Sequence, residues 1–230
     1  MLIIFDLDDT LIETSLGVTS VLLDRFKKRL IDLGIQEDET AIGERFWKYY
    51  YECSSSQVAA RLVLGSHPGL EKKALESALD IFQHPDISDI EIAPIKGALD
   101  LLTNLKGQCS IALCTRGDPQ LQRLKMKKSG IEPDFFDKIC VGLEDKGIYY
   151  QEILDHFKID AGSVSRSAIV CGDKVLFDLV PAKKLGCATI QFLRPFRNVE
   201  EQLSSFVDHQ IKTLNDFLPI VQEQQVWSIK

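Results

Sequence analysis

The second part of the chain alternates short apolar runs with helical patterns, and this alternation limits the possible folds more than any other feature. An apolar run that predicts a strand also opens the chain. The five predicted strands are LIIF (2–5), CSIALCT (109–115), KICVG (138–142), SAIVCGD (167–173) and CATIQFL (187–193). Short apolar strands separated by helices are typical of a parallel sheet that is covered on both faces and has right-handed crossovers. We therefore predict the α/β class, with a Rossmann-like doubly wound parallel sheet as the core.

The stretch between the first predicted strand and Pro94 is helical in pattern. Apolar residues recur there at helical spacing, over 16–33, 40–53, 56–64 and 69–82. We predict an all-helical domain inserted at 14–93, which leaves 1–13 and 94–230 to form the α/β core. The aromatic run FWKYYY (46–51) is expected to pack within the inserted domain. Two more helical patterns close the chain, at 198–206 and 214–222.

The composition is that of an ordinary globular protein, and its charge argues against some partners. Hydrophobic residues make up 45% of the chain, and the formal net charge is -7. An acidic protein lacks the electrostatic footprint of a protein that binds nucleic acid or anionic membranes, so any phosphate site must be local. The six cysteines lack zinc-ligand and CxxC spacing, and no stretch is long enough to span a bilayer. We expect a cytoplasmic protein, a monomer or homodimer, that binds neither nucleic acid nor membrane.

Polar side chains follow four of the predicted strands, close to the point where each strand ends. They are Asp6, Asp8 and Asp9, then Thr115 and Arg116, then Lys146, and finally Asp173 with Asp178. Because doubly wound sheets bind ligands beyond the carboxyl ends of their strands, we expect these groups to converge. Carboxylates held together raise one another's pKa unless a cation lies among them. The acids after the first strand therefore predict a Mg²⁺ site shared with Asp173 or Asp178, because Mg²⁺ prefers oxygen ligands of this kind.

These residues stand in the order of four motifs of the haloacid dehalogenase superfamily of phosphohydrolases, which the chain resembles over essentially its whole length. The first motif, DxDxT, is similar to DLDDT (6–10), and the fourth, GDxxxxD, is similar to GDKVLFD (172–178). Between them, Thr115 matches the threonine or serine that ends a strand, and Lys146 matches the lysine before a helix. The inserted helices resemble, in position, a helical cap of the C1 type.

The resemblance implies a role for each matched residue. Asp6 would be the nucleophile that forms an aspartyl-phosphate, and Asp8 would protonate the leaving alcohol and then deprotonate the attacking water. Thr115 and Lys146 would bind phosphoryl oxygens. The implied Mg²⁺ ligands are Asp6, the backbone carbonyl of Asp8, Asp173 and Asp178, the last of which either binds the ion or orients its water.

The pair formed by Asp6 and Asp8 also has an independent physical reason. Side chains at positions i and i+2 of an extended strand point the same way, so both carboxylates can face one substrate. One carboxylate can attack phosphorus while the other exchanges a proton with the ester oxygen. Members of the family that displace halide from carbon lack the second acid. By this resemblance, Asp8 favours phosphoryl transfer over dehalogenation.

Two departures from the family pattern leave alternatives open. Lys146 is followed by Gly147 where a proline is common, and other lysines could take its place. The other candidates are Lys125, Lys127 and Lys128. We favour Lys146 because it lies between a predicted strand and a predicted helix, and we expect the basic patch 125–128 to form a solvated helix face. Arg116 either contacts substrate or only braces its loop.

The sequence therefore predicts a Mg²⁺-dependent phosphatase that acts on a small phosphorylated metabolite. A phosphomutase would use the same residues, and a non-catalytic module that binds phosphorylated ligands would keep the same scaffold, so both stay open as alternatives. Phosphoglycolate, sugar phosphates, nucleoside monophosphates and flavin mononucleotide are all compatible substrates. The chain has no Walker, GxGxxG or GxSxG motif. The sequence therefore gives no support for nucleotide-triphosphate, hydride-transfer or serine-hydrolase chemistry.

Overall fold

The computed structural model of the protein describes residues 1–195 and 201–227, and the chain divides into two compact units. Met1–Glu13 and Ile92–Lys230 form the first, which we name the core unit, and Thr14–Glu91 form the second, the helical unit. No helix among the described residues is long and apolar enough to cross a membrane. Each unit has its own buried interior, so the two are described separately.

The core unit is built on a parallel sheet with the strand order β3-β2-β1-β4-β5-β6. The strands are β1 (Leu2–Phe5), β2 (Ser110–Arg116), β3 (Lys138–Gly142), β4 (Ala168–Gly172), β5 (Ala188–Phe192) and β6 (His209–Ile211). Strand β1 lies between β2 and β4, and its Ile4 pairs in register with Ala112 and Val170. The predicted α/β class and doubly wound parallel sheet are therefore confirmed.

The edge strand β6 was not predicted, because its three residues are too short and too polar to show a strand pattern. Its place is fixed by contacts with β5. The carboxylate of Asp208, just before β6, accepts hydrogen bonds from the backbone N–H of Thr189 at 2.9 Å and from the Thr189 hydroxyl at 3.1 Å. A side chain that takes the place of a backbone partner in this way recruits a short segment that local sequence alone does not mark as a strand.

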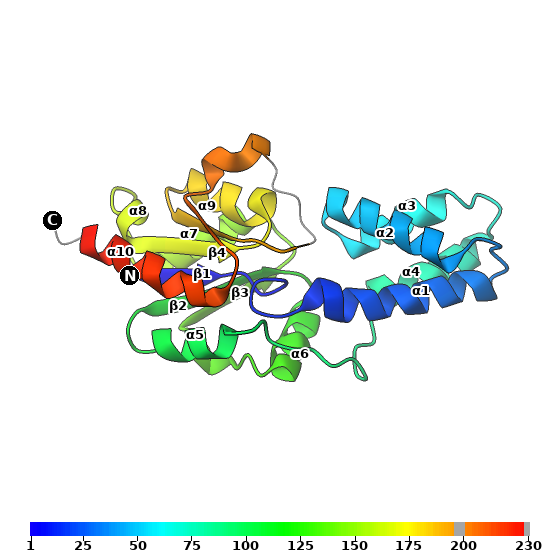
Figure 1. Ribbon diagram of the computed structural model, residues 1–230, viewed down its shortest axis with the longest axis horizontal. Coiled ribbons are helices and arrows are strands. Elements are labelled where there is room, and N and C mark those ends of the chain that lie inside the picture. The colour runs from blue at the N-terminus through cyan, green and yellow to red at the C-terminus, as the bar shows by residue number, and fades with distance from the viewer. Residues whose placement is uncertain (196–200, 228–230) are drawn as a thin grey trace. The chain divides into compact units, whose positions relative to one another are not determined.

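Helices cover both faces of the sheet. Figure 1 shows α7 (Lys146–His156) and α9 (Val180–Lys184) on one side, and α5 (Ala98–Leu105) and α6 (Pro119–Ser129) on the other. Successive strand residues point to opposite faces. Ile4 therefore joins the buried cluster that contains Tyr150 of α7, whereas Phe5 packs on Phe217 of α10 (Phe217–Trp227) with ring centroids 5.1 Å apart.

Short helical segments complete the core unit. They are η2 (Pro133–Phe135), α8 (Val164–Ser167), η3 (Val175–Leu179), η4 (Glu201–Phe206) and η5 (Leu214–Asp216). The helix predicted over 214–222 is confirmed as η5 followed by α10. Of the helix predicted over 198–206, residues 201–206 form a 3-10 helix, and residues 198–200 lie outside the described residues.

The helical unit contains η1 (Thr14–Thr19), α1 (Ser20–Asp32), α2 (Glu39–Cys53), α3 (Ser56–Gly65) and α4 (Lys72–Gln83). The four predicted helical stretches are confirmed, although the first opens with a π-helical segment and the last begins three residues late. Phe46 lies at the centre of the interior, with its ring centroid 5.2 Å from that of Phe82 and 6.4 Å from that of Phe26. Aromatic rings at these separations make favourable offset or edge contacts. The aromatic run therefore packs the helices, as predicted.

The order of the strands fixes where the chain reverses its direction across the sheet. The chain runs from β1 outward to β2 and β3, and then returns to form β4 on the other side of β1. This is the switch point at which doubly wound sheets bind ligands, beyond the carboxyl ends of the strands. Asp6 follows β1 and Asp173 follows β4, so the first and fourth motifs lie on adjacent strands. The Asp6 backbone N–H donates to the carbonyl of Cys171 at 3.0 Å, which continues the pairing to this edge.

Candidate active site

A tight turn follows β1 and carries the first two acids. Asp9 has a φ of 60°, a left-handed conformation that aspartate tolerates better than most residues. The turn closes on itself through backbone hydrogen bonds from Asp9 to Ile12 at 2.8 Å and from Leu11 to Leu7 at 2.9 Å. The turn places its first two acids in different surroundings: Asp6 is buried, whereas Asp8 is only partly covered.

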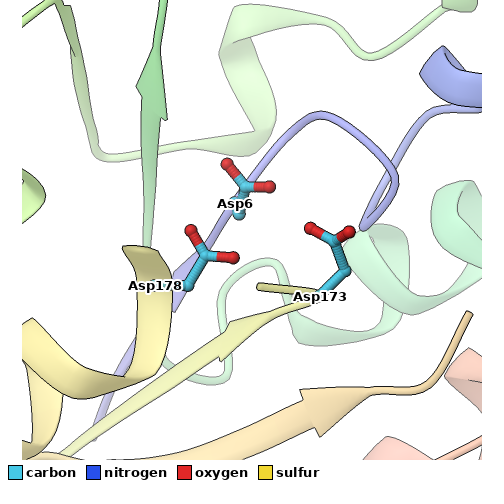
Figure 2. A group of neighbouring side chains, drawn as sticks. All are labelled: Asp6, Asp173 and Asp178. Carbon is cyan, nitrogen blue, oxygen red and sulfur yellow. The ribbon is translucent and has the colours of Figure 1, made fainter. Parts of the chain in front are cut away.

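Three carboxylates meet at the carboxyl ends of β1 and β4. Asp6, Asp173 and Asp178 are all buried, and one oxygen from each lies within 4.8 Å of the others. Figure 2 shows the three side chains converging from the end of β1, the end of β4 and η3. Gly172 permits this approach, because a Cβ atom at that position would lie 2.5 Å from the Cβ of Asp178. The spacing of the GDxxxxD motif thus brings its two acids to the same place as Asp6.

Lys146 lies beside this carboxylate cluster, at the start of α7. Its Nζ is 2.5 Å from Asp6 Oδ1 and 2.7 Å from Asp178 Oδ1, and its side chain is 3% exposed. Burial by itself would lower the pKa of Lys146, but the Asp178 and Asp6 carboxylates raise that pKa well above its ordinary value. Lys146 is therefore a charged ammonium that binds two of the three acids.

The electrostatics of Asp6 reflect its burial beside other carboxylates. The pKa of Asp6 is raised to about 6, mainly by burial and also by the charges of Asp178 and Asp8, although Lys146 opposes the shift. Three buried carboxylate oxygens that lie close together are the donor set that a hard divalent cation such as Mg²⁺ prefers. The residues present therefore fit a divalent metal ion.

Asp8 has different partners, and they come from α6. Lys125 Nζ lies 2.8 Å from Asp8 Oδ1, and Gln122 Nε2 lies 2.7 Å from Asp8 Oδ2. Lys125 is only 7% exposed, so the prediction that it belongs to a solvated helix face is wrong. The sequence reasoning also missed Gln122. One signal could have found both: Gln122 and Lys125 are three residues apart and share one face of the helix.

Thr115 and Arg116 end β2 and differ in their surroundings. Thr115 is buried, and its Oγ1 accepts a hydrogen bond from Gln122 Nε2 at 2.8 Å. Arg116 is exposed, and its guanidinium lies over the ring of Phe177, 5.5 Å from the centroid. The structure thus joins Thr115 to Asp8 through Gln122, and it places Arg116 against η3.

Comparisons with known proteins agree with this arrangement. Residues 1–186 match the family model of the haloacid dehalogenase-like hydrolases. The glyceraldehyde 3-phosphate phosphatase of Methanocaldococcus jannaschii is 25% identical over 96% of this chain and 96% of its own length.

Solved structures share the fold over nearly the whole chain. A Thermotoga maritima protein assigned as a β-phosphoglucomutase has a TM-score of 0.71 at 13% identity, and covers 96% of this chain and 98% of its own. A Bacillus subtilis protein assigned as the HAD-hydrolase YfnB, bound to magnesium, has a TM-score of 0.66 at 20% identity, and covers 96% of this chain and 97% of its own.

Proposed function

This chain belongs to the haloacid dehalogenase-like hydrolases and is a phosphoric monoester hydrolase, and from that premise we propose that it hydrolyses small phosphorylated metabolites with Mg²⁺ through an aspartyl-phosphate on Asp6. The observation that carries the proposal is the position of Asp6 at the switch point of the sheet. Asp6 contacts Lys146 at 2.5 Å and lies within a buried group of three acids. Asp8, two residues later, has separate partners on α6.

Asp6, Asp173 and Asp178 would hold the Mg²⁺ ion, together with the backbone carbonyl of Asp8. The three side chains supply buried carboxylate oxygens that lie close together, and Mg²⁺ prefers oxygen ligands of this kind. The magnesium-bound relative of the same fold supports this proposal. When bound, Mg²⁺ supplies charge neutralisation for the phosphoryl oxygens and for the attacking carboxylate.

In the first chemical step, a carboxylate oxygen of Asp6 attacks phosphorus while the bond from phosphorus to the ester oxygen breaks. Asp8, in its protonated form, gives its proton to the departing oxygen, so the product leaves as an alcohol. Lys146 keeps the Asp6 carboxylate in place and offsets its repulsion with the phosphate dianion. The Thr115 hydroxyl binds a phosphoryl oxygen.

In the second step, water attacks the phosphorus of the aspartyl-phosphate. The Asp8 carboxylate takes the proton of that water, and the bond from phosphorus to Asp6 breaks. Inorganic phosphate leaves, and both aspartates return to their starting states. The role of Lys146 in both steps is electrostatic, because its ammonium lies beside the oxygen at which charge changes.

The substrate is proposed by class only. The relative that spans 96% of this chain is named as a glyceraldehyde 3-phosphate phosphatase, which supports a small phosphorylated compound. Arg116, exposed at the end of β2 and braced by Phe177, is proposed to contact the non-reacting part of that substrate. The six free cysteines, four of them buried, support action in the reducing cytoplasm.

The test is phosphate release from p-nitrophenyl phosphate and from a panel of small esters, including glyceraldehyde 3-phosphate, phosphoglycolate and nucleoside monophosphates, in Mg²⁺ or EDTA. We expect Mg²⁺-dependent release that falls at least about 10⁴-fold in Asp6→Asn, because the nucleophile is lost. The matched control is Asp134→Asn, which removes an exposed acid from the same unit and should leave the rate unchanged.

Two other results would replace the proposal with an alternative. A phosphomutase would transfer the phosphoryl group between positions of a sugar phosphate, would require a bisphosphate activator and would release little free phosphate. A binding module would bind a phosphorylated ligand with Mg²⁺ but would not turn it over.

A further inference from the structure

The inner face of α6 is more polar than is usual for a helix packed on a sheet, because Met126 is the only apolar residue among its four buried side chains. Gln122 and Lys125 are buried on this face, whereas Leu124 between them is 40% exposed. Both buried residues contact the carboxylate of Asp8. We infer that Lys125 and Gln122 are positioning residues that hold the Asp8 carboxyl group for proton exchange with the leaving group, an inference that rests on the proposed function.

Two contacts fix the plane of the Asp8 carboxyl group. Lys125 Nζ is 2.8 Å from Oδ1 and Gln122 Nε2 is 2.7 Å from Oδ2, so each oxygen has its own donor. A single contact would allow the carboxyl group to rotate about its terminal bond, whereas two donors from one rigid helix remove that freedom. A carboxyl oxygen can accept more than one hydrogen bond, so these two contacts do not by themselves prevent Asp8 from exchanging a proton with a substrate.

Gln122 also links Asp8 to Thr115. Its Nε2 lies 2.8 Å from Thr115 Oγ1 and 2.9 Å from the carbonyl oxygen of Arg116. The carboxylate and the carbonyl can only accept, so the nitrogen side of the amide must face them. The amide nitrogen has two hydrogens for these three acceptors, so at least one hydrogen is shared between two of them. The Thr115 hydroxyl can only accept from this nitrogen, so its own hydrogen can donate to a phosphoryl oxygen. One amide therefore sets the direction of both the proton-exchanging acid and the phosphate-binding hydroxyl.

The loop before α6 is shaped to admit the Gln122 side chain. Gly117 has a φ of 149°, and a Cβ atom there would lie 3.1 Å from Gln122 Nε2. The next residue, Asp118, caps α6 by accepting from the backbone N–H of Leu121 at 2.9 Å. The glycine and the cap together fix where the helix begins, and thus where Gln122 and Lys125 emerge.

The burial of Lys125 separates this pair from an ordinary surface ion pair. The Lys125 side chain is 9% exposed, and its partner Asp8 is 18% exposed. Removing an ammonium from water is costly unless a charged partner compensates for it, and the pair adds little where both groups remain exposed. Lys125 is thus covered, while Asp8 keeps an open side from which a substrate can approach.

The experiment compares two esters on the same enzyme preparation. An alkyl phosphate leaves as a strongly basic alkoxide and needs a proton, whereas p-nitrophenyl phosphate leaves as a stable phenolate and needs little help. We would measure kcat/KM with Mg²⁺ for p-nitrophenyl phosphate and for the best alkyl ester of the panel. The variants are Lys125→Met, Lys125→Arg, Gln122→Leu and, as a matched control on the exposed face of α6, Lys127→Met.

We expect kcat/KM for the alkyl ester to fall roughly 10²-fold in Lys125→Met and Gln122→Leu, against less than about 10-fold for the aryl ester. In Lys125→Arg, the ratio of kcat/KM for the alkyl ester to kcat/KM for the aryl ester should return part of the way to the wild-type value, because the charged donor is restored. Lys127→Met should match the wild type. The ratio of the two values does not depend on the fraction of enzyme that is folded, so a loss of stability cannot imitate the effect.

Equal losses on both esters would overturn the inference, because Lys125 and Gln122 would then only attach α6 to the turn after β1. Wild-type values for both esters in both variants would overturn it as well. The Asp6→Asn variant is measured in the same assay. Retained hydrolysis in Asp6→Asn would count against the proposed nucleophile. An unchanged ester ratio in Lys125→Met would count only against the positioning role, so the two failures can be told apart.

Discussion

The two units of the molecule bury different kinds of side chain. Among the described residues, every buried charged group belongs to the core unit: Asp6, Asp9, Lys125, Lys146, Asp173, Asp178 and Arg194. The buried polar groups of the helical unit are all uncharged, namely Thr14, Ser15 and Thr19. Its interior is formed by rings such as Phe26, Phe46 and Phe82. Buried charge costs free energy unless it is compensated, so its concentration in one unit fits the active site proposed there.

The charged residues described in the helical unit are half-buried or exposed, and none is fully buried. Arg25 pairs with Asp89 at 2.6 Å, but the Asp89 side chain is 73% exposed. The hydrogen bond from Arg25 lowers the pKa of Asp89, and exposed pairs of this kind add little to stability. The core unit therefore buries compensated charge, whereas the helical unit depends on apolar packing.

The largest effect should come from removing the lysine of the buried cluster. Lys146→Met leaves Asp6 and Asp178 buried without their ammonium, so we expect the free energy of unfolding to fall by about 3–5 kcal/mol. Phosphatase activity should be lost as well. Urea unfolding and phosphate release measure the two effects. The control, Lys138→Met, breaks a pair with Glu152 whose side chains are 27% and 53% exposed, and should cost less than about 1 kcal/mol.

The interior of the helical unit gives the next effect. Phe46 is fully buried among rings, so Phe46→Ala should lower the free energy of unfolding by about 3–4 kcal/mol through lost burial and a new cavity. Added Mg²⁺ should still raise the melting temperature of this variant, because the carboxylate cluster lies wholly in the core unit. Tyr51→Ala, at a ring that is 39% exposed, is the control. A similar loss in both variants would contradict the contrast between the units.

The smallest effect is a pH dependence of the metal-free protein. The pKa of Asp6 is about 6 in the folded protein against 3.8 for an unperturbed aspartate, so the folded state binds more protons between these limits. Stability should therefore fall as pH rises from about 4 to 6, by up to about 3 kcal/mol. Unfolding in EDTA measures this fall. Asp6→Asn should remove this fall, and a fall of the same size in both proteins would show that Asp6 is not its origin.

The sequence predicted most of the core because the signals there are local. The strands β1 to β5 coincide with short runs rich in apolar residues, and the motif residues lie at the ends of these runs or within about six residues after them. Register and topology then bring Asp6 and Asp173 together, since adjacent parallel strands end at one edge. Strand β6 was missed because it depends on a distant partner, the Thr189 of β5.

The surroundings of Asp8 show most clearly what the sequence alone did not determine. Lys125 is 117 positions from Asp8, and its helix has Leu124 outside and Lys125 inside, which reverses the usual pattern. The residue pattern of a single helix assigns a lysine to solvent, because that pattern contains no information about a carboxylate from a distant part of the chain.

The sequence by itself determined the fold class, the order of the motifs and the identity of the acids, because local pattern and spacing encode them. Only the tertiary structure decided which cation lies beside which acid. Lys146 pairs with Asp6 and Asp178, and Lys125 pairs with Asp8. The physical reason is that ion pairing depends on distances of a few ångströms between side chains, and those distances are set by how helices and strands pack across the sheet.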